Sequence, residues 1–139
     1  MATQQTYELK VDTGAITVPI IDNGEEIGRF RFNPSDWDII RRFEKTVKFF
    51  EGLQVKDDMT EAEFFEITDG IKTQFDFLLN YEVSGEIFGR CNPLSLTSDG
   101  DTFVEVVLEG IAGIIEKVTD QRLAKKSVQI KKATAKYHK

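Results

Sequence analysis

The first quarter of the chain is patterned for β-structure. Apolar and polar residues alternate in three short runs between positions 7 and 32, and the first run separates Tyr7, Leu9 and Val11 by charged neighbours. Successive side chains of a β-strand point to opposite faces, so a period of two is typical of strands that bury one face. Turn residues lie between the runs, including Asn23-Gly24, a favoured two-residue hairpin turn. The pattern predicts a three-stranded antiparallel β meander.

Pro19 lies inside the second of these runs. Proline has no backbone N–H and cannot donate to a sheet ladder, so it indicates a strand at a sheet edge or beside a bulge. The unpaired backbone groups of an edge are able to pair with another chain. We therefore expect an edge at which subunits can add strands to one another.

From Asn33 onward the apolar residues recur at intervals of three and four. This spacing places them on one face of a helix and predicts helices over about 35–51 and 60–81, with a third from about 101. Ser35 and Thr60 are each followed by an acid three residues later, as in a capping box.

A short run, 84–89, fits a single helical turn, and the Asn-, Pro-, Ser- and Gly-rich stretch 91–100 fits a loop. The predicted fold is therefore α+β. An N-terminal three-stranded antiparallel β meander is followed by three main α-helices, of which the last is long and basic at its end.

The chain has 139 residues, of which 40% are hydrophobic. This length suits one domain, because domains usually hold about 100–200 residues. The apolar stripe of the third helix fades after Val118. We expect residues 1–120 to form a single α+β domain and residues 121–139 to form a basic C-terminal helical extension or a flexible tail.

The charge is unevenly distributed along the chain. The net charge is -6, which disfavours nucleic acid and an anionic membrane as partners of the whole molecule. After Asp120 there is no acid, and seven cations follow: Arg122, Lys125, Lys126, Lys131, Lys132, Lys136 and Lys139. Three roles remain open for this tail: pairing with phosphates, docking on an acidic protein surface, or keeping the chain in solution. Only Tyr137 could stack on a base, which weakens the nucleic-acid interpretation.

No residue pattern predicts catalysis, a cofactor or a metal. The single histidine, His138, lies at the end of the basic tail, and the single cysteine, Cys91, has no histidine near it in the sequence. The acid pairs at 57–58 and 99–101 fit helix capping and solubility better than a calcium loop, whose twelfth position here is Gly110. No nucleotide-binding or hydrolase motif is present. A non-enzymatic protein is expected.

The sequence shows neither a targeting signal nor a membrane-spanning stretch, and this bears on the expected location of the protein. No charged-then-apolar leader opens the chain, and no apolar stretch approaches the roughly 20 residues that span a bilayer. One cysteine cannot form an internal disulfide. We expect a soluble, cytoplasmic protein with no membrane partner.

The sequence contains 11 phenylalanines, more than the predicted helical stripes use. Phe49, Phe65 and Phe77 fall off these stripes and belong either to a wrapped core or to a partner surface. Together with the sheet edge they predict a homo-oligomer. The candidate partner-binding residues are therefore Phe49, Phe65, Phe77, Arg122, Lys125, Lys126, Lys131 and Lys132.

Two segments together carry a family resemblance. FRFNPSDWDIIRRF, residues 30–43, follows the β-patterned region, and SGEIFGRCNPLSLTSDGDTFVEVVLEGI, residues 84–111, follows the second predicted helix. Over roughly residues 5–118 the chain resembles the small tail assembly chaperones of long-tailed phages and prophages of Gram-positive bacteria. The basic tail departs from anything that this pattern requires.

The resemblance implies a non-enzymatic protein of the host cytoplasm. Such a chaperone would self-associate and coat the hydrophobic tape measure protein during tail morphogenesis, until the tail tube replaces it. The resemblance supplies no catalytic residue, cofactor or metal. Two other classes stay open: a structural virion component, such as a connector or tail tube subunit, and a nucleic-acid-binding accessory protein that acts through the basic tail.

Overall fold

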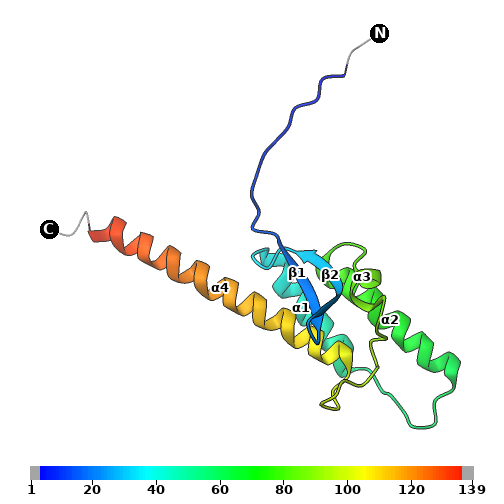
Figure 1. The fold of residues 1–139 in the computed structure, drawn as a ribbon. Coiled ribbons are helices and arrows are strands. Elements are labelled where there is room, and N and C mark those ends of the chain that lie inside the picture. The colour runs from blue at the N-terminus through cyan, green and yellow to red at the C-terminus, as the bar shows by residue number, and fades with distance from the viewer. Residues whose placement is uncertain (1–3, 136–139) are drawn as a thin grey trace.

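The structure is a computed structural model, and it describes the backbone of residues 4–135 and the side chains of residues 4–121. Its class is α+β, as predicted, with a β-hairpin followed by helices (Figure 1). The elements are β1 (Ile16–Asp22), β2 (Glu25–Phe32), α1 (Trp37–Glu51), α2 (Glu61–Leu79), α3 (Ser84–Phe88) and α4 (Phe103–Ala135).

The predicted three-stranded meander is wrong. The sheet has two antiparallel strands, β1 and β2, and residues 4–15 form no strand. Tyr7, Leu9 and Val11 are 85%, 90% and 72% exposed in an extended arm that leaves the body (Figure 1). The alternation in this arm is real, but an alternating segment forms a strand only where a neighbour accepts its backbone hydrogen bonds.

The prediction of three helices is also wrong, because the described residues form four. The additional helix is the short α3, which the sequence suggests only as a single turn. The Asp76 carboxylate at the end of α2 accepts hydrogen bonds from the backbone N–H groups of Val83 and Ser84, at 2.8 and 2.7 Å. This carboxylate therefore satisfies N–H groups at the start of α3 that the helix itself leaves unpaired.

The hairpin turn forms as predicted. Asn23 and Gly24 have φ angles of 48° and 84°, the left-handed conformations that a tight two-residue turn requires. The pairing shifts by one residue between Ile20 and Ile21, where Ile27 of β2 has no partner, so the strand that contains Pro19 lies beside a bulge and has a free edge. Both features follow the expectation from this proline.

Helices α1 and α2 form the most tightly connected pair. Side chains cap the first turn of both helices: the Asp36 carboxylate accepts from Asp38 N, and the Thr60 hydroxyl accepts from Glu63 N. The cap of α1 is therefore Asp36, one residue after the expected Ser35. Between the helices, Arg42 Nε donates to the Leu78 carbonyl at 2.9 Å. This bond satisfies a carbonyl in the last turn of α2 that has no helical partner.

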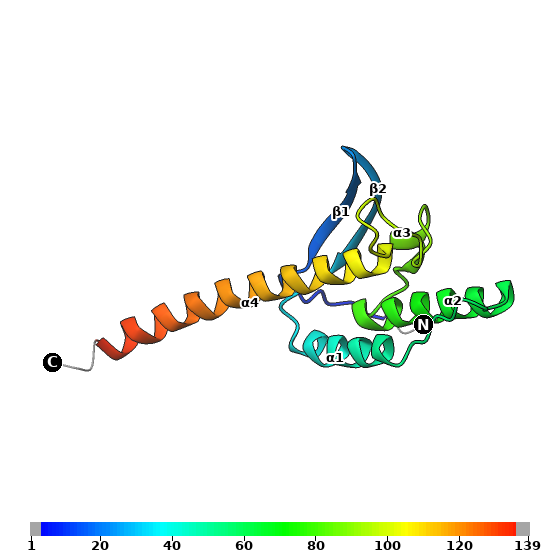
Figure 2. The ribbon, with the colours of Figure 1, turned by 90° about the horizontal axis from the view of Figure 1, so that it is seen from below.

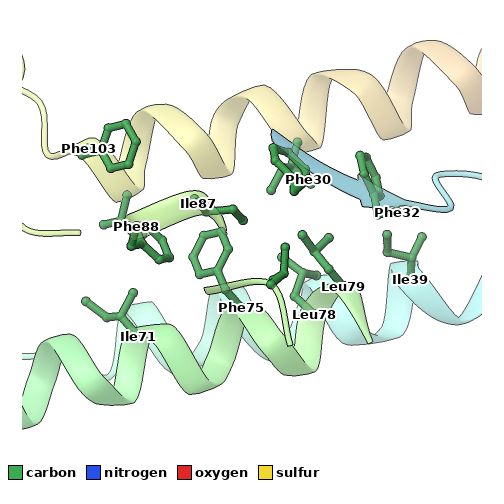
Figure 3. Close-up of a cluster of buried hydrophobic side chains, with 13 residues drawn as sticks. Phe30, Phe32, Ile39, Ile71, Phe75, Leu78, Leu79, Ile87, Phe88 and Phe103 are labelled. Carbon is green, nitrogen blue, oxygen red and sulfur yellow. The ribbon is translucent and has the colours of Figure 1, made fainter. Parts of the chain in front are cut away.

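The core lies between this helix pair and α4, with β2 and α3 in the middle (Figure 3). Phe75 of α2 is fully buried at its centre, and its ring meets those of Phe50 and Phe88 edge to face at 6.3 and 5.1 Å. Aromatic pairs in this arrangement contribute about 0.5–1.5 kcal/mol beyond their buried area. Phe30 and Phe32 of β2 are also buried, which fixes the inward face of the hairpin.

Helix α4 passes along the hairpin and then projects from the body (Figure 2). Among its described side chains only Phe103, Val104 and Ile111 are buried. The helix continues past Asp120 to Ala135, so residues 121–135 extend it without a break. Residues 136–139 lie outside the described part of the chain.

Candidate functional site

Grooves with largely apolar walls lie on both flanks of α4. On one flank a groove of about 670 Å³ separates the hairpin from the first turns of α4. We call it the hairpin groove, and its main lining residues are Val18, Ile20, Val106, Val107, Gly110 and Ile114. Its polar lining comes from Asp22 and Asn23 at the hairpin turn and from Arg90, Thr97 and Ser98 on the side of the 91–100 loop.

The opposite flank of α4 carries two further grooves. The first, the loop groove, has a volume of about 750 Å³ and is lined chiefly by Phe50, Leu53, Val55, Phe64, Leu94 and Leu108. The second, the seam groove, has a volume of about 280 Å³ and lies between α1 and α4 at Ile40, Phe43, Ala112 and Ile115. By helical spacing the residues that α4 contributes here lie on the other side of the helix from Val106 and Gly110.

The grooves exist because α4 is fastened mainly at its start. The backbone N–H groups of Phe103 and Val104 donate to the carbonyls of Ser95 and Pro93, at 2.8 and 2.9 Å. Further along, Val107, Leu108 and Ile115 are only partly buried, although their spacing marks the helix face that points toward the core. The apolar face of α4 is therefore wider than the body covers.

Two glycines on α4 lie in open space. A Cβ at Gly110 or Gly113 would meet no atom within 4 Å, so neither glycine is needed for close packing inside this chain. Gly110 lines the hairpin groove, whereas Gly113 lines none of the three grooves. A helix loses about 1 kcal/mol for each glycine relative to alanine, so both positions reduce the stability of α4.

The buried polar side chains of the described residues are engaged in structure. Every buried side-chain nitrogen or oxygen among them has a hydrogen-bond partner, and no three metal-ligating side chains of this part of the chain cluster together. The Tyr81 hydroxyl accepts from the Arg31 N–H at 2.6 Å. Burial raises the pKa of Tyr81 above its ordinary value of 10.0, and the Arg31 N–H opposes the shift.

The structure separates the three phenylalanines that the sequence singles out. Phe49 is partly buried between α1 and α2, with its ring edge against Phe50 and 3.6 Å from the Cβ position of Gly70. Phe65 is 47% exposed near the start of α2, and Phe77 is 41% exposed near its end with the Lys45 ammonium 6.0 Å from its ring centre. These rings do not form one continuous surface, since Phe65 and Phe77 are about 18 Å apart along the helix.

The remaining candidates are also placed. The side chains of Arg122, Lys125, Lys126, Lys131 and Lys132 lie beyond residue 121 and so outside the described side chains, although their backbone belongs to α4. His138 lies outside the described residues altogether. Cys91 is partly buried, and its thiol points to the Asn92 carbonyl at 3.7 Å.

Sequence reasoning missed the surface residues Val55, Leu96 and Val106, which are 58%, 72% and 45% exposed. Val106 offered one signal, because it widens the apolar face of the third predicted helix beyond what one core requires. Val55 and Leu96 offered none, since isolated apolar residues in loops are common.

Comparisons with protein-family models, with curated proteins and with solved structures found no match to this chain. Among the described residues, no helix has the length and apolar character needed to cross a membrane. The geometry of the grooves is therefore the main guide to function.

Proposed function

We propose that the protein is a non-enzymatic tail assembly chaperone of a long-tailed phage or prophage, which self-associates and binds the tape measure protein during tail morphogenesis. The observation that carries the proposal is the pair of apolar flanks that the body leaves uncovered on α4. The family resemblance at residues 30–43 and 84–111 supports the same function.

A chaperone of this kind needs two separate binding surfaces, one for its own copies and one for a long helical client. The two flanks of α4 meet this requirement, because an occupant of one does not cover the other. Apolar grooves beside a helix are also the usual receptors for the apolar face of an amphipathic partner helix.

We assign the client to the loop groove. This groove is the larger one on its flank, and its apolar lining comes from several elements: α1, α2, the 91–100 loop and α4. Asp57 and Glu105 lie at the same groove and can pair with basic residues on the polar face of a bound helix. The hairpin groove then remains for self-association.

Coexpression with the tape measure protein of the same genome tests this assignment. The wild-type chain should keep the tape measure protein in the soluble fraction and copurify with it. Val55→Asp places a carboxylate in the loop groove at a side chain that is already 58% exposed, so the fold should persist. We expect roughly tenfold weaker copurification, since apolar contacts are lost and a charge is desolvated.

Gln54→Asp is the matched control. It adds the same charge to the neighbouring residue of the same loop, but Gln54 does not line the groove. Equal losses for the two variants would contradict the loop groove as the client site, and no copurification by the wild-type chain would contradict the chaperone function. Presence of the chain in finished particles would indicate a virion component, and DNA binding that falls steeply with salt would indicate the nucleic-acid alternative.

A further inference from the structure

The N-terminal arm, residues 4–13, has the pattern of a strand and none of the contacts of one. The hydrogen bonds of its side chains are local, such as that from the Tyr7 hydroxyl to Gln5 Oε1 at 2.7 Å. Its three alternating apolar side chains are among the most exposed of the molecule. A row of exposed apolar residues at strand spacing indicates a segment that buries these side chains and pairs its backbone only when it lies beside another strand.

The outer edge of β1 is the open edge of the sheet. On the outer side of β2, the Arg31 N–H points away from β1 and donates to the Tyr81 hydroxyl. Helix α3 packs on one face of β2 at Gly28, where a Cβ would collide with the Glu86 carbonyl oxygen. The Arg31 contact therefore occupies the outer edge of β2. Among the described residues, no backbone hydrogen bond outside the hairpin ladder involves Thr17 or Pro19.

The hairpin register shows which groups this edge offers. In an antiparallel pair, the backbone N–H and carbonyl groups of two opposite residues either bond to each other or point to the outer edges of the two strands. The Arg31 N–H points to the outer edge of β2, so the backbone groups of its partner Thr17 point to the outer edge of β1. The same holds two residues further on for Pro19, which pairs with Arg29. Thr17 therefore presents an N–H and a carbonyl at the open edge, and Pro19 presents a carbonyl while its missing N–H costs the hairpin nothing.

We infer that the arm of a second copy of this chain adds to the outer edge of β1 as an intermolecular strand. The inference deepens the self-association in the proposed function and rests on it. Val18 and Ile20 face inward from β1 and line the hairpin groove. A strand beside β1 would place Tyr7, Leu9 and Val11 on the same inward side, so that their side chains fill the groove and Glu8 and Lys10 face water.

The arm is directed away from the β1 edge of its own chain. The Ser35 hydroxyl at the start of α1 donates to the Thr13 carbonyl at 3.1 Å, which fixes the base of the arm to the body. Gly14 follows with a φ of 83°, and the chain leaves the body from this point (Figure 1). Exchange of arms between two copies gives both an added strand and follows the general geometry of segment swapping.

Two pairs of matched variants test the inference by light scattering and analytical ultracentrifugation. Leu9→Ser removes an inward side chain of the arm, and Lys10→Ser changes its outward neighbour. Thr17→Pro removes the outward N–H of the edge at a register position equivalent to Pro19, whereas Thr17→Val keeps it. We expect Leu9→Ser and Thr17→Pro to weaken self-association by about tenfold or more, with Lys10→Ser and Thr17→Val close to wild type.

A mixing experiment distinguishes an arm that adds to the β1 edge of another chain from an arm that folds back onto the β1 edge of its own chain. A chain that lacks residues 1–11 has an edge but no arm, and the Thr17→Pro chain has an arm but a blocked edge. Each should be monomeric alone, and the mixture should form a one-to-one dimer. Circular dichroism at the same concentrations should show that both chains are folded, because the arm makes no core contact.

Self-association that persists without residues 1–11 would overturn the inference and leave the proposed function intact. A wild-type chain that is monomeric at all concentrations would overturn both the inference and the self-associating part of the proposed function. Tape measure binding is tested by a separate variant, Val55→Asp, because Val55 lies on the other flank of α4 and does not line the hairpin groove.

Discussion

Helices α1 and α4 both pack on the same core, yet they are held in different ways. Helix α1 is joined to α2 by polar contacts as well as apolar ones, with Arg42 on the Leu78 carbonyl and Gln74 Nε2 on the Thr46 hydroxyl at 3.0 Å. Helix α4 is tied by backbone hydrogen bonds at its first turn, and beyond Ile111 its described apolar side chains are only partly buried. The comparison separates a part of the molecule that supplies stability from a part that supplies surface.

The difference matters for binding. Polar contacts across a helix pair fix its geometry, because each buried donor or acceptor that loses its partner costs about 1–3 kcal/mol. A helix held by apolar contacts can admit an additional apolar neighbour without breaking such bonds. The α1–α2 pair therefore fits the role of a scaffold, and α4 fits the role of a docking element.

The largest expected effect on stability comes from truncating an apolar side chain to alanine, once in the α1–α2 scaffold and once in α4. Phe75→Ala removes the fully buried central ring and should cost about 3–5 kcal/mol in free energy of unfolding. Ile115→Ala in α4 should cost only about 1 kcal/mol, because its side chain is partly exposed at the seam groove. Urea denaturation followed by circular dichroism measures both. Equal losses would mean that α4 is part of the stabilising core.

A smaller effect is expected at the two glycines of α4. Gly110→Ala and Gly113→Ala should each raise the free energy of unfolding by about 1 kcal/mol, because both positions are open and alanine favours the helix. Gly110→Leu should in addition weaken self-association, since its side chain enters the hairpin groove. Gly113→Leu is the control with the same substitution outside the groove. Thermal melting and light scattering together distinguish the two effects, and assembly unaffected by Gly110→Leu would argue against the hairpin groove as an interface.

The smallest effect concerns pH. The pKa of Tyr81 is raised in the folded chain, mainly by burial, so above pH 10 the folded state holds a proton that the unfolded state releases. Stability should therefore be complete below pH 10 and decline as the pH rises beyond it. Tyr81→Phe should remove this decline, while Tyr7→Phe, at a residue 85% exposed, should leave it unchanged. A decline of the same slope in the Tyr81→Phe variant would assign it to other groups.

The sequence predicts the elements whose signals are local. The Asn23-Gly24 turn, the Thr60 cap and the apolar spacing of α2 each depend on residues close together in the chain, and each forms in the structure. The arm fails as a predicted strand because alternation describes one strand only and says nothing about its partner. Spacing alone is also ambiguous at the start of α1: Trp37 fits the apolar spacing of the helix, yet it is 79% exposed and Ile39 is the residue that is buried in the core.

The candidate site was less predictable than the fold. Its grooves arise where α4 meets the hairpin and the 91–100 loop, segments that are far apart in the sequence. Spacing identifies which residues of α4 are apolar, but it does not say how much of that face the rest of the chain covers. Hence Val106 and Leu96 emerge as surface residues only once the packing is known.

The attachment of α4 at its first turn also makes it a lever. Its 33 residues form a rod about 50 Å long, so a tilt of about 10° at Phe103 would carry the far end through about 9 Å. The hairpin groove and the loop groove lie on opposite sides of this rod. Any tilt across the body that widens one groove narrows the other. A molecule bound in one groove therefore changes the width of the other groove.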